Sequence, residues 1–516
     1  MPAHQGQPIA GGGSLRLQPW ADPGCIARDG AIAFVGAAVG APFDHATFVA
    51  DATGVRAVAR GAGGPGGAGV TSVGGDPAPG GGTLAGMFGG TPFVPSITDD
   101  GDVLFLADVH AGPVPRALFL HVAVTGSLVR IAAVGAGFSA VGPGVARSAR
   151  EVLFAARATG RSAAELFRWR DGAVTPLAAV GDPAPGGGTI AALVTEWLTF
   201  ADGTSVPIGP LPAVDSCGRV AFRALASGAS APGGILVRDD GGDAWWLRLG
   251  ASTPVGGTYT AFGAPVLGGD GVLAVFADHT SPGGPTAGWF VGRPGAFRRA
   301  LGFHDPVDDG RCLGLALSRS PMTPLDDRGD LVLWCDLSLT GGADRIVRCR
   351  ADGGIDVLMR RGDALAGGAV GALNGWPSAR AAAGAAVAAQ LQGGALPAAH
   401  LRVSRCRPAV VVPACSVPGA DLALAVPGPA GEGFVLAAST AGVAQPLPPF
   451  GVLGLGAPML ALAPGVPYSA PPATWSSRWV IPPDPGLRGV SLHFQALHVP
   501  SAGLPTLTAR STCRLR

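Results

Sequence analysis

Apolar positions in the first four hundred residues fall into short runs, each placed directly after a turn rich in Asp and Gly. The clearest copies of this turn and strand run Asp29–Phe34, Asp100–Phe105 and Cys217–Phe222. Apolar side chains recur in them with a period of two, which is typical of a β-strand. Glycine supplies the positive φ of a turn, and Asp bonds the backbone two residues on. We therefore expect Asp100, Gly101 and Gly218 to form structural turns.

The same unit repeats along this region. Weaker copies begin at Arg150, Asp270, Arg328 and Gly384, which gives seven at a spacing of roughly 50 to 70 residues. Further short strands follow, such as Phe119–Val122, Leu166–Trp169 and Ile235–Arg238. Each unit then holds three or four strands, as one propeller blade does. We expect an all-β chain with a β-propeller of about seven blades. A β-sandwich array or β-solenoid is the alternative.

Helical periodicity is weak throughout this part of the chain. Only residues 380–391, which are rich in Ala, fit a helix as well as they fit the last copy of the turn strand. The sequence leaves these two interpretations open.

A second signature of the repeat is a loop rich in Gly and Pro. The string GDPAPGGGT occurs at residues 75–83 and returns unchanged at 181–189, with degenerate copies at 250–258 and 362–368. A catalytic site needs one copy, so repetition favours a structural role. The loop residues that we assign to this role are Gly75, Asp76, Pro77, Gly181, Asp182 and Pro183. We expect each Asp to bond the backbone amides of the Ala and Gly that follow it.

These motifs resemble those of a family of uncharacterised bacterial tandem-repeat proteins. The resemblance covers about residues 25–395 and rests on the GDPAPG loop and the Asp-Gly strand. It implies a β-propeller that is exported to the cell surface. No enzymatic activity can be carried over from this family.

The remainder of the chain differs in composition. The pattern that begins at Ile481-Pro482-Pro483 and ends at Gln495-Ala496 resembles a small all-β domain found at the C-terminus of many exported bacterial proteins. This resemblance implies a β-sandwich over about residues 417–516. We divide the chain into an N-terminal segment (1–24), a repeat propeller (25–404) and a C-terminal β-sandwich domain (405–516).

Composition excludes several classes of function. The 516 residues include 84 Gly and 48 Pro, yet 47% are hydrophobic, which argues against disorder. All 36 basic residues are Arg, so chemistry that needs Lys, at a P-loop or a Schiff base, is excluded. The net charge of +1 without a basic stripe argues against nucleic-acid binding. No apolar stretch is long enough to predict a membrane span, and we expect a monomer.

The compartment stays open at this point. Residues 1–7 lack a basic and an apolar region, so no signal peptide is predicted, and a cytoplasmic protein is the alternative to the exported one. The eight Cys form no CxxC motif, which argues against structural zinc. Disulfides between Cys335 and Cys349, or among Cys406, Cys415 and Cys513, compete with buried free thiols.

Two groups of side chains are candidate ligand sites. Asp99, Asp100 and Asp102 would suit Ca²⁺, although capping of the turn accounts for them as well. No other cofactor is expected. Trp245, Trp246 and Trp289 would suit a sugar-binding surface, with core packing as the alternative.

The sequence favours a non-enzymatic, exported platform that binds a polysaccharide or a surface protein. A carbohydrate-active enzyme, either a glycoside hydrolase or a lyase, is the second hypothesis. It requires carboxylates that converge at one mouth of the propeller, and the acids that lie outside the repeat, Glu196, Asp305 and Asp308, are its first candidates. A purely structural envelope component is the third.

Overall fold

The structure is a computed structural model whose chain divides into two compact units, Met1–Ser404 and Arg405–Arg516. No α-helix occurs in the residues that the structure describes, and none of them forms a helix long and apolar enough to cross a membrane. The described residues are 3–10, 12–17, 24–62, 75–87, 94–194, 196–199, 205–215, 217–229, 231–239, 241–268, 271–281, 283–308, 310–315, 324–326, 329–338, 344–365, 368–373, 377–380, 384–392, 398–403, 415–416, 421–428, 433–440, 442–447, 451–455, 459–467, 473–481, 483–484, 487, 490–499, 506–507 and 511–515.

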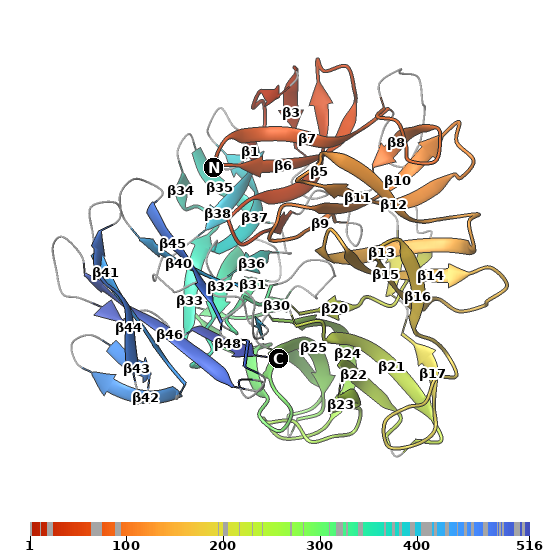
Figure 1. The fold of residues 1–516 in the computed structure, drawn as a ribbon. Coiled ribbons are helices and arrows are strands. Elements are labelled where there is room, and N and C mark those ends of the chain that lie inside the picture. The colour runs from red at the N-terminus through yellow and green to blue at the C-terminus, as the bar shows by residue number, and fades with distance from the viewer. Residues whose placement is uncertain are drawn as a thin grey trace. The chain divides into compact units, whose positions relative to one another are not determined.

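The first unit is a β-propeller of seven blades, which confirms the expected fold class (Figure 1). The main strands of each blade are antiparallel and pair with their neighbours in chain order. In blade 2, β8 (Thr83–Met87) and β9 (Ser96–Ile97) both pair with β10 (Val103–His110), and β11 (Arg116–Val122) and β12 (Ser127–Ala133) complete the sheet.

The other blades repeat this order. Blade 1 contains β3 (Ser14–Arg16), β4 (Cys25–Ile26), β5 (Ile32–Val39), β6 (His45–Asp51) and β7 (Gly54–Gly61), with β2 (Ile9–Ala10) parallel to β7. Blade 3 contains β13 (Phe138–Ser148), β14 (Glu151–Ala158), β15 (Glu165–Arg170) and β16 (Ala173–Ala178). Blade 4 contains β17 (Thr189–Leu193), β20 (Ala213–Val214), β21 (Val220–Ser227), β22 (Gly233–Asp239) and β23 (Gly242–Arg248).

Blade 5 contains β24 (Tyr259–Leu267), β25 (Leu273–His279), β26 (Thr286–Gly292) and β27 (Arg298–Gly302). Blade 6 contains β30 (Gly314–Leu315), β31 (Leu331–Asp336), β32 (Asp344–Cys349) and β33 (Ile355–Arg360). Blade 7 contains β34 (Ala364–Leu365), β35 (Gly368–Leu373), β36 (Ser378–Arg380), β37 (Gly384–Gln392), β38 (Ala398–Val403) and β1 (Ala3–His4). Two hairpins lie between blade strands, β18 (Glu196–Thr199) with β19 (Ser205–Gly209) and β28 (Pro306–Val307) with β29 (Gly310–Arg311).

Central strands are apolar on both faces because each blade packs against two neighbours. In β10, Leu104 and Leu106 belong to a core shared with blade 3, whereas Phe105 and Ala107 belong to one shared with blade 1. Successive strand residues point to opposite faces, so every position finds an apolar partner. This explains why the turn strands of the repeat read as nearly continuous apolar runs.

The seventh blade is closed by the beginning of the chain. Strand β1 pairs with β38, with Ala3 opposite His400. Ala3 and Ile9 then share one core with Ala386 and Ala398 of blade 7. The stretch 380–391, for which a helix was the alternative, contains β37, the central strand of this blade.

The Asp-Gly turns join the first and second strands of a blade with one geometry. The Thr98 N–H donates to the Asp102 carbonyl at 2.9 Å and the Gly101 N–H to the Thr98 carbonyl at 3.1 Å. Blades 1, 4, 5 and 6 repeat both bonds, and the turn glycine has a φ near +85°, as Gly101 (86°) and Gly218 (84°) show. We call the end of the propeller that carries these turns the turn face.

The Gly/Pro-rich loops join the last strand of one blade to the first strand of the next. Asp182 Oδ2 accepts a hydrogen bond from the Ala179 N–H at 2.9 Å, and Asp76 Oδ2 accepts one from the Arg60 N–H at 2.8 Å. The bond therefore reaches back to the preceding strand, and not forward to Ala and Gly as the sequence suggested. The Gly187 N–H bonds the Ala184 carbonyl instead, which closes the loop through the backbone.

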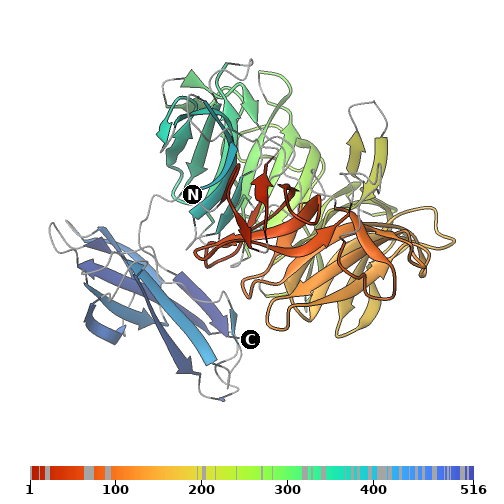
Figure 2. The same cartoon turned by 90° about the horizontal axis from the view of Figure 1, so that it is seen from above.

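The second unit is a small β-sandwich (Figure 2). One sheet contains β39 (Cys415–Ser416), β48 (Ser511–Leu515), β46 (Ser491–Val499), β41 (Gly433–Ser439), β44 (Met459–Pro467) and β47 (Thr506–Leu507). The remaining strands form the pairs β40 (Asp421–Gly428) with β45 (Ala473–Val480) and β42 (Gly442–Leu447) with β43 (Gly451–Leu455).

Cys312, Cys335 and Cys349 of the propeller are free thiols. In the register of β31 and β32, Cys335 lies opposite Arg345 and Cys349 opposite Leu331, so the two cysteines sit four positions apart along the strands. A disulfide between them is therefore excluded by geometry, and both are buried and free, as is Cys312. Cys406 and the side chains of Cys415 and Cys513 lie outside the described residues.

Candidate binding site on the turn face of blades 3 and 4

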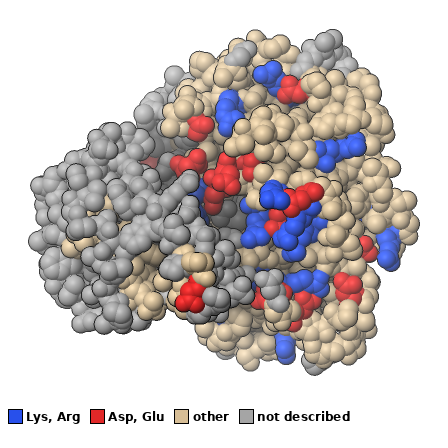
Figure 3. All heavy atoms as spheres, viewed as in Figure 1, with Lys and Arg blue, Asp and Glu red and all other residues tan. Residues whose placement is uncertain are grey.

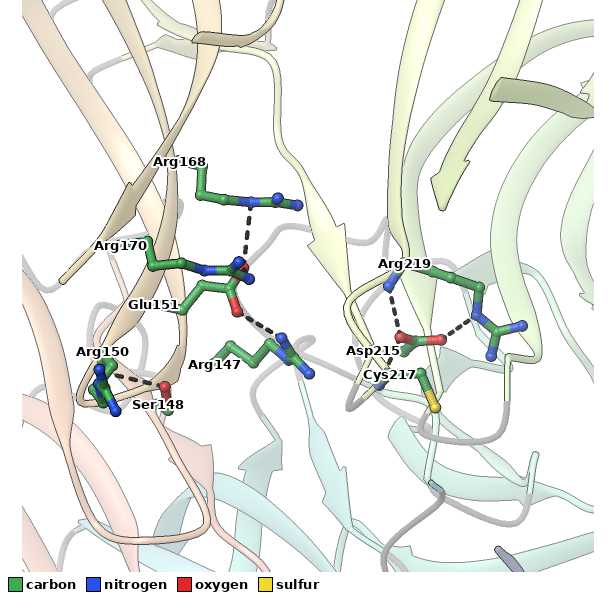
Figure 4. Close-up of polar contacts among 9 residues, drawn as sticks. All are labelled: Arg147, Ser148, Arg150, Glu151, Arg168, Arg170, Asp215, Cys217 and Arg219. Atoms are coloured by element: carbon green, nitrogen blue, oxygen red, sulfur yellow. Dashed lines mark hydrogen bonds and ion pairs between the residues drawn. The ribbon is translucent and has the colours of Figure 1, made fainter. Parts of the chain in front are cut away.

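A buried carboxylate, Glu151, collects three arginines on the turn face of blade 3. It is the first residue of β14, directly after the turn, and its side chain is only 8% exposed. Its Oε2 lies 2.5 Å from Arg147 Nη1, and its Oε1 lies 2.9 Å from Arg170 Nη2. Arg168 Nε approaches Oε1 at 3.2 Å. We call Glu151, Arg147, Arg168 and Arg170 the Glu151 cluster (Figure 4).

Strand register creates this cluster. Arg168 and Arg170 are two positions apart on β15, so their side chains leave the same face of the strand. Glu151 lies directly opposite Arg170 in the β14–β15 register. Arg147 is near the end of β13, the adjacent strand, four residues before Glu151. The three arginines therefore reach the carboxylate from the two strands that flank it.

The turn of blade 3 departs from the repeat and adds a further ion pair. Ser148 pairs with Glu151 directly, and no turn glycine is present. Arg150 occupies the turn and its Nε bonds Asp171 Oδ1 at 2.5 Å, which raises the pKa of Arg150. The backbone N–H of Arg150 also donates a hydrogen bond to Ser148 Oγ at 3.2 Å.

Blade 4 contributes a second buried carboxylate beside the cluster. The Asp215 side chain is fully buried, and its Oδ2 lies 2.6 Å from Arg219 Nε. Its Oδ1 accepts the backbone N–H groups of Cys217 and Arg219, each at 2.9 Å. Burial still dominates and raises the pKa of Asp215, with Arg219 acting in the opposite direction. Arg219 in turn lies over the Trp246 ring, 6.0 Å from its centroid.

The two groups meet across the blade boundary. A Cβ placed on Gly218 would lie 3.2 Å from Arg147 Nη1, so the arginine of blade 3 rests on the turn of blade 4. Figure 4 shows both groups side by side. Figure 3 shows that basic and acidic side chains gather together on one face of the propeller.

The arrangement is suited to binding rather than to proton transfer. Arginine stays protonated in proteins, so it supplies no acid or base. The Glu151 cluster sets three guanidinium charges against one carboxylate, a net local charge of +2. The Arg170 side chain is 55% exposed and that of Arg168 is 28% exposed, so both side chains reach solvent. Guanidinium groups of this kind bind carboxylates, sulfates and phosphates.

The acidic candidates for Ca²⁺ take part in turn and blade contacts. Asp102 is buried and its Oδ1 accepts the Ala123 N–H at 3.0 Å. Asp99 Oδ1 accepts the backbone N–H of Arg28, in blade 1, at 3.1 Å. Asp100 is exposed. Among the described residues no group of three or more His, Cys, Asp or Glu is arranged to hold a metal ion.

The tryptophan candidates separate into core and surface. Trp289 is 1% exposed and packs in the shared core of blades 5 and 6. Trp245 is buried as well, and its Nε1 donates to the Pro185 carbonyl of the preceding Gly/Pro loop at 2.9 Å. Both are core residues and not a ligand surface. Trp246 is half-buried beside Arg219.

Two of the acids expected to lie outside the repeat have structural partners. Asp305 Oδ2 accepts the Gly302 N–H at 2.7 Å, the bond that Asp182 makes, so Asp305 is itself a repeat Asp. Asp308 receives both Nε and Nη2 of Arg360 at 2.7 and 2.8 Å, which lowers the pKa of Asp308. The side chain of Glu196 lies outside the described residues.

Sequence reasoning did not find the Glu151 cluster. Its members are spread from Arg147 to Arg170, and only the strand register brings them together. A signal was present in the repeat itself. Blade 3 replaces the Asp-Gly turn with Ser-Ala-Arg-Glu, and the next strand of the same blade carries the pair Arg168 and Arg170. Charged residues at positions where the other repeats have the Asp-Gly turn indicate that this turn has a different role.

Comparisons with known proteins assign no family. No family model matches the chain, and no curated protein matches it. Solved structures similar to it include an oligogalacturonate lyase in complex with manganese, with 11% identity, a TM-score of 0.33 and coverage of 65% of this chain and 76% of that one. A second is a polysaccharide lyase, with 9% identity, a TM-score of 0.29 and coverage of 65% of this chain and 87% of that one. A third is a fungal alcohol oxidase in complex with copper, with 11% identity, a TM-score of 0.25 and coverage of 100% of this chain and 97% of that one.

Proposed function

We propose that the protein is a non-enzymatic binding platform at the bacterial cell surface, with a polysaccharide or a surface protein as its partner. The observation that carries the proposal is the Glu151 cluster. It presents Arg168 and Arg170 from one rigid strand, held by a buried carboxylate. Side chains fixed in this way lose little freedom when a ligand binds, which favours affinity.

The hydrogen bonds of the acidic side chains support the same proposal. An enzyme that cleaves sugars needs carboxylates that can donate or accept a proton at the substrate. Asp305 and Asp308 instead bond the backbone and arginines of their own blades. The repeat acids Asp76 and Asp182 bond the backbone of the preceding strand. These carboxylates are engaged in holding the propeller together.

A carbohydrate-active enzyme is the second candidate, and one observation favours it. Asp336 and Asp344 face each other in the register of β31 and β32, and both are buried. Burial, followed by the charge of Asp336, raises the pKa of Asp344. A buried carboxylate whose pKa is raised beside a second carboxylate is typical of the general acid in glycosidases.

One experiment separates the two candidates. The purified protein is incubated with soluble and insoluble polysaccharides, and retention is recorded together with new reducing or unsaturated ends. The proposal expects retention without new ends. New ends that disappear in both Asp336→Asn and Asp344→Asn would establish the second candidate and reject the first. Absence of both retention and new ends would remove polysaccharide as the partner.

A further inference from the structure

We propose that the Glu151 cluster recognises the anionic groups, carboxylate or sulfate, of an acidic polysaccharide. This inference rests on the proposed function and names the chemistry of its ligand. The first support is the supply of donors. Arg170 uses Nη2 for Glu151, and its side chain is 55% exposed. Within the described part of the chain, Glu151 is the one carboxylate that pairs with Arg168 or with Arg170.

Arg168 adds an unsatisfied donor. Its Nε is buried and makes no hydrogen bond to any described residue, although the ion pair with Glu151 holds it in place at 3.2 Å. A buried donor without a hydrogen bond is unfavourable. A ligand oxygen that bonds the guanidinium of Arg168 would stabilise the site by moving the guanidinium into better hydrogen-bond geometry. Arg168 and Arg170 together place two adjacent forked guanidinium groups on one face of the strand. Each guanidinium can donate two parallel hydrogen bonds to a pair of oxygens of a carboxylate or sulfate.

Local charge balance selects the kind of anion. The Glu151 cluster carries a net +2, while the adjacent pairs Arg150 with Asp171 and Arg219 with Asp215 are neutral. The Glu151 cluster is therefore bordered by carboxylates. Nucleic acids present a continuous row of phosphates and need an extended basic surface. A polysaccharide built of uronic acids, such as alginate, carries one carboxylate per sugar, so a single anionic group can enter the cluster.

The affinity test uses the full-length protein with four probes. These are alginate, which carries carboxylates, dextran sulfate, unmodified dextran and a single-stranded oligonucleotide. Binding is measured by affinity electrophoresis at low and at raised salt. We expect alginate or dextran sulfate to bind, dextran not to bind, and affinity to fall as salt rises. The response to alginate relative to dextran sulfate identifies which anionic group is preferred.

Three variants locate the binding. Arg170→Ala leaves Arg147 and Arg168 on Glu151, so we expect it to fold and to bind about tenfold more weakly. The double variant Arg168→Lys with Arg170→Lys keeps the charge but loses the forks, and it should also weaken binding. The matched control is Arg157→Ala, at the other end of β14, where Arg157 Nε bonds Ser139 Oγ at 2.9 Å. Its affinity should be unchanged.

The outcomes separate this inference from the proposed function. Equal binding of dextran and alginate, or full affinity in Arg170→Ala, would overturn the inference and leave the platform proposal standing. Tighter binding of a single-stranded oligonucleotide than of alginate would reject polysaccharide as the ligand. New reducing ends would overturn the platform proposal alone. Absence of binding to all three polysaccharides would reject the inference and remove polysaccharide from the proposed function.

Discussion

Arg147 of blade 3 fills the space in which a side chain on Gly218 of blade 4 would begin, with its Nη1 at 3.2 Å from that point. Gly218 also has a φ of 84°. Two constraints therefore act on one position. The backbone conformation disfavours any side chain, and the neighbouring guanidinium, which Glu151 anchors, takes up the room.

Gly218→Ala separates these constraints. A positive φ costs an alanine about 1–2 kcal/mol, and displacement of Arg147 adds to that cost. The control is Gly172→Ala, because Gly172 has a φ of 89° and nothing within 4 Å of its Cβ position. We expect urea denaturation to show a larger loss of the free energy of unfolding in Gly218→Ala. Equal losses of the free energy of unfolding in the two variants would show that Arg147 moves aside at no measurable cost.

Glu151→Gln tests the carboxylate at the centre of the cluster. Removal of its charge leaves three arginines close together, and we expect a loss of about 2 kcal/mol, below the range for fully buried pairs because the arginines are partly exposed. Glu165→Gln is the comparison. Glu165 is equally buried, but among the described residues its one ion pair is with the exposed Arg161, at 3.7 Å. Chemical denaturation of both variants should show the smaller loss in Glu165→Gln, and the reverse order would contradict the prediction.

Stability should depend on pH with opposite sign at two carboxylates. The folded-state pKa of Asp215 lies above its ordinary value of 3.8, because burial disfavours the charge. Stabilisation from this proton is complete below pH 3.8 and is lost as the pH rises through the raised pKa. The stability of the wild type relative to Asp215→Asn should therefore fall over that range.

Asp308 gives the reverse case. Hydrogen bonds from Arg360 lower the pKa of Asp308 below 3.8, so its stabilisation is complete above that value and is lost as the pH falls through the lowered pKa. The wild type should lose stability relative to Asp308→Asn as the solution is acidified. Denaturation series for wild type and both variants, recorded across the acidic range, measure the two slopes. Slopes of the same sign would contradict the assignment.

Closure of the propeller through β1 gives a further prediction. Ala3 is fully buried in the core that joins blades 7 and 1, whereas Ala10 of β2 is exposed. Ala3→Glu places an unpaired charge in that core and should cost more than 2 kcal/mol, about the least that burial of an unpaired polar group costs. Ala10→Glu should change stability little. Thermal melting of the two variants measures the difference, and similar melting temperatures would argue against closure by β1.

Much of the propeller was predictable because its repeat has a physical cause. Gly101 and Gly218 occupy turns that need positive φ, and the strands after them are apolar, so the units could be recognised in the sequence. The direction of the Asp182 hydrogen bond was not predictable, since the preceding strand and the following loop both offer N–H groups. Only the path of the chain decides between them.

Asp305 shows where a repeat becomes hard to recognise. Its Asp-Pro pair matches the loop motif, but the hairpin of β28 and β29 follows it and displaces the rest of the pattern. The Glu151 cluster was hidden for a different reason. Arginines on separate strands become neighbours only through register, and the sequence alone did not place Arg147 and Arg170 beside one carboxylate.

The first strands of successive blades touch one another, with β4 against β9, β9 against β13, β13 against β20 and β20 against β24. They form the inner rim of the ring. In blade 4 this rim strand is split into β17 and β20, and the hairpin of β18 and β19 fits between the halves without breaking the pairing of either half with β21. Length can therefore change at the rim while the outer strands keep their register. The break between β17 and β20 is therefore a position at which a loop can be inserted while the pairing of the blade strands is kept.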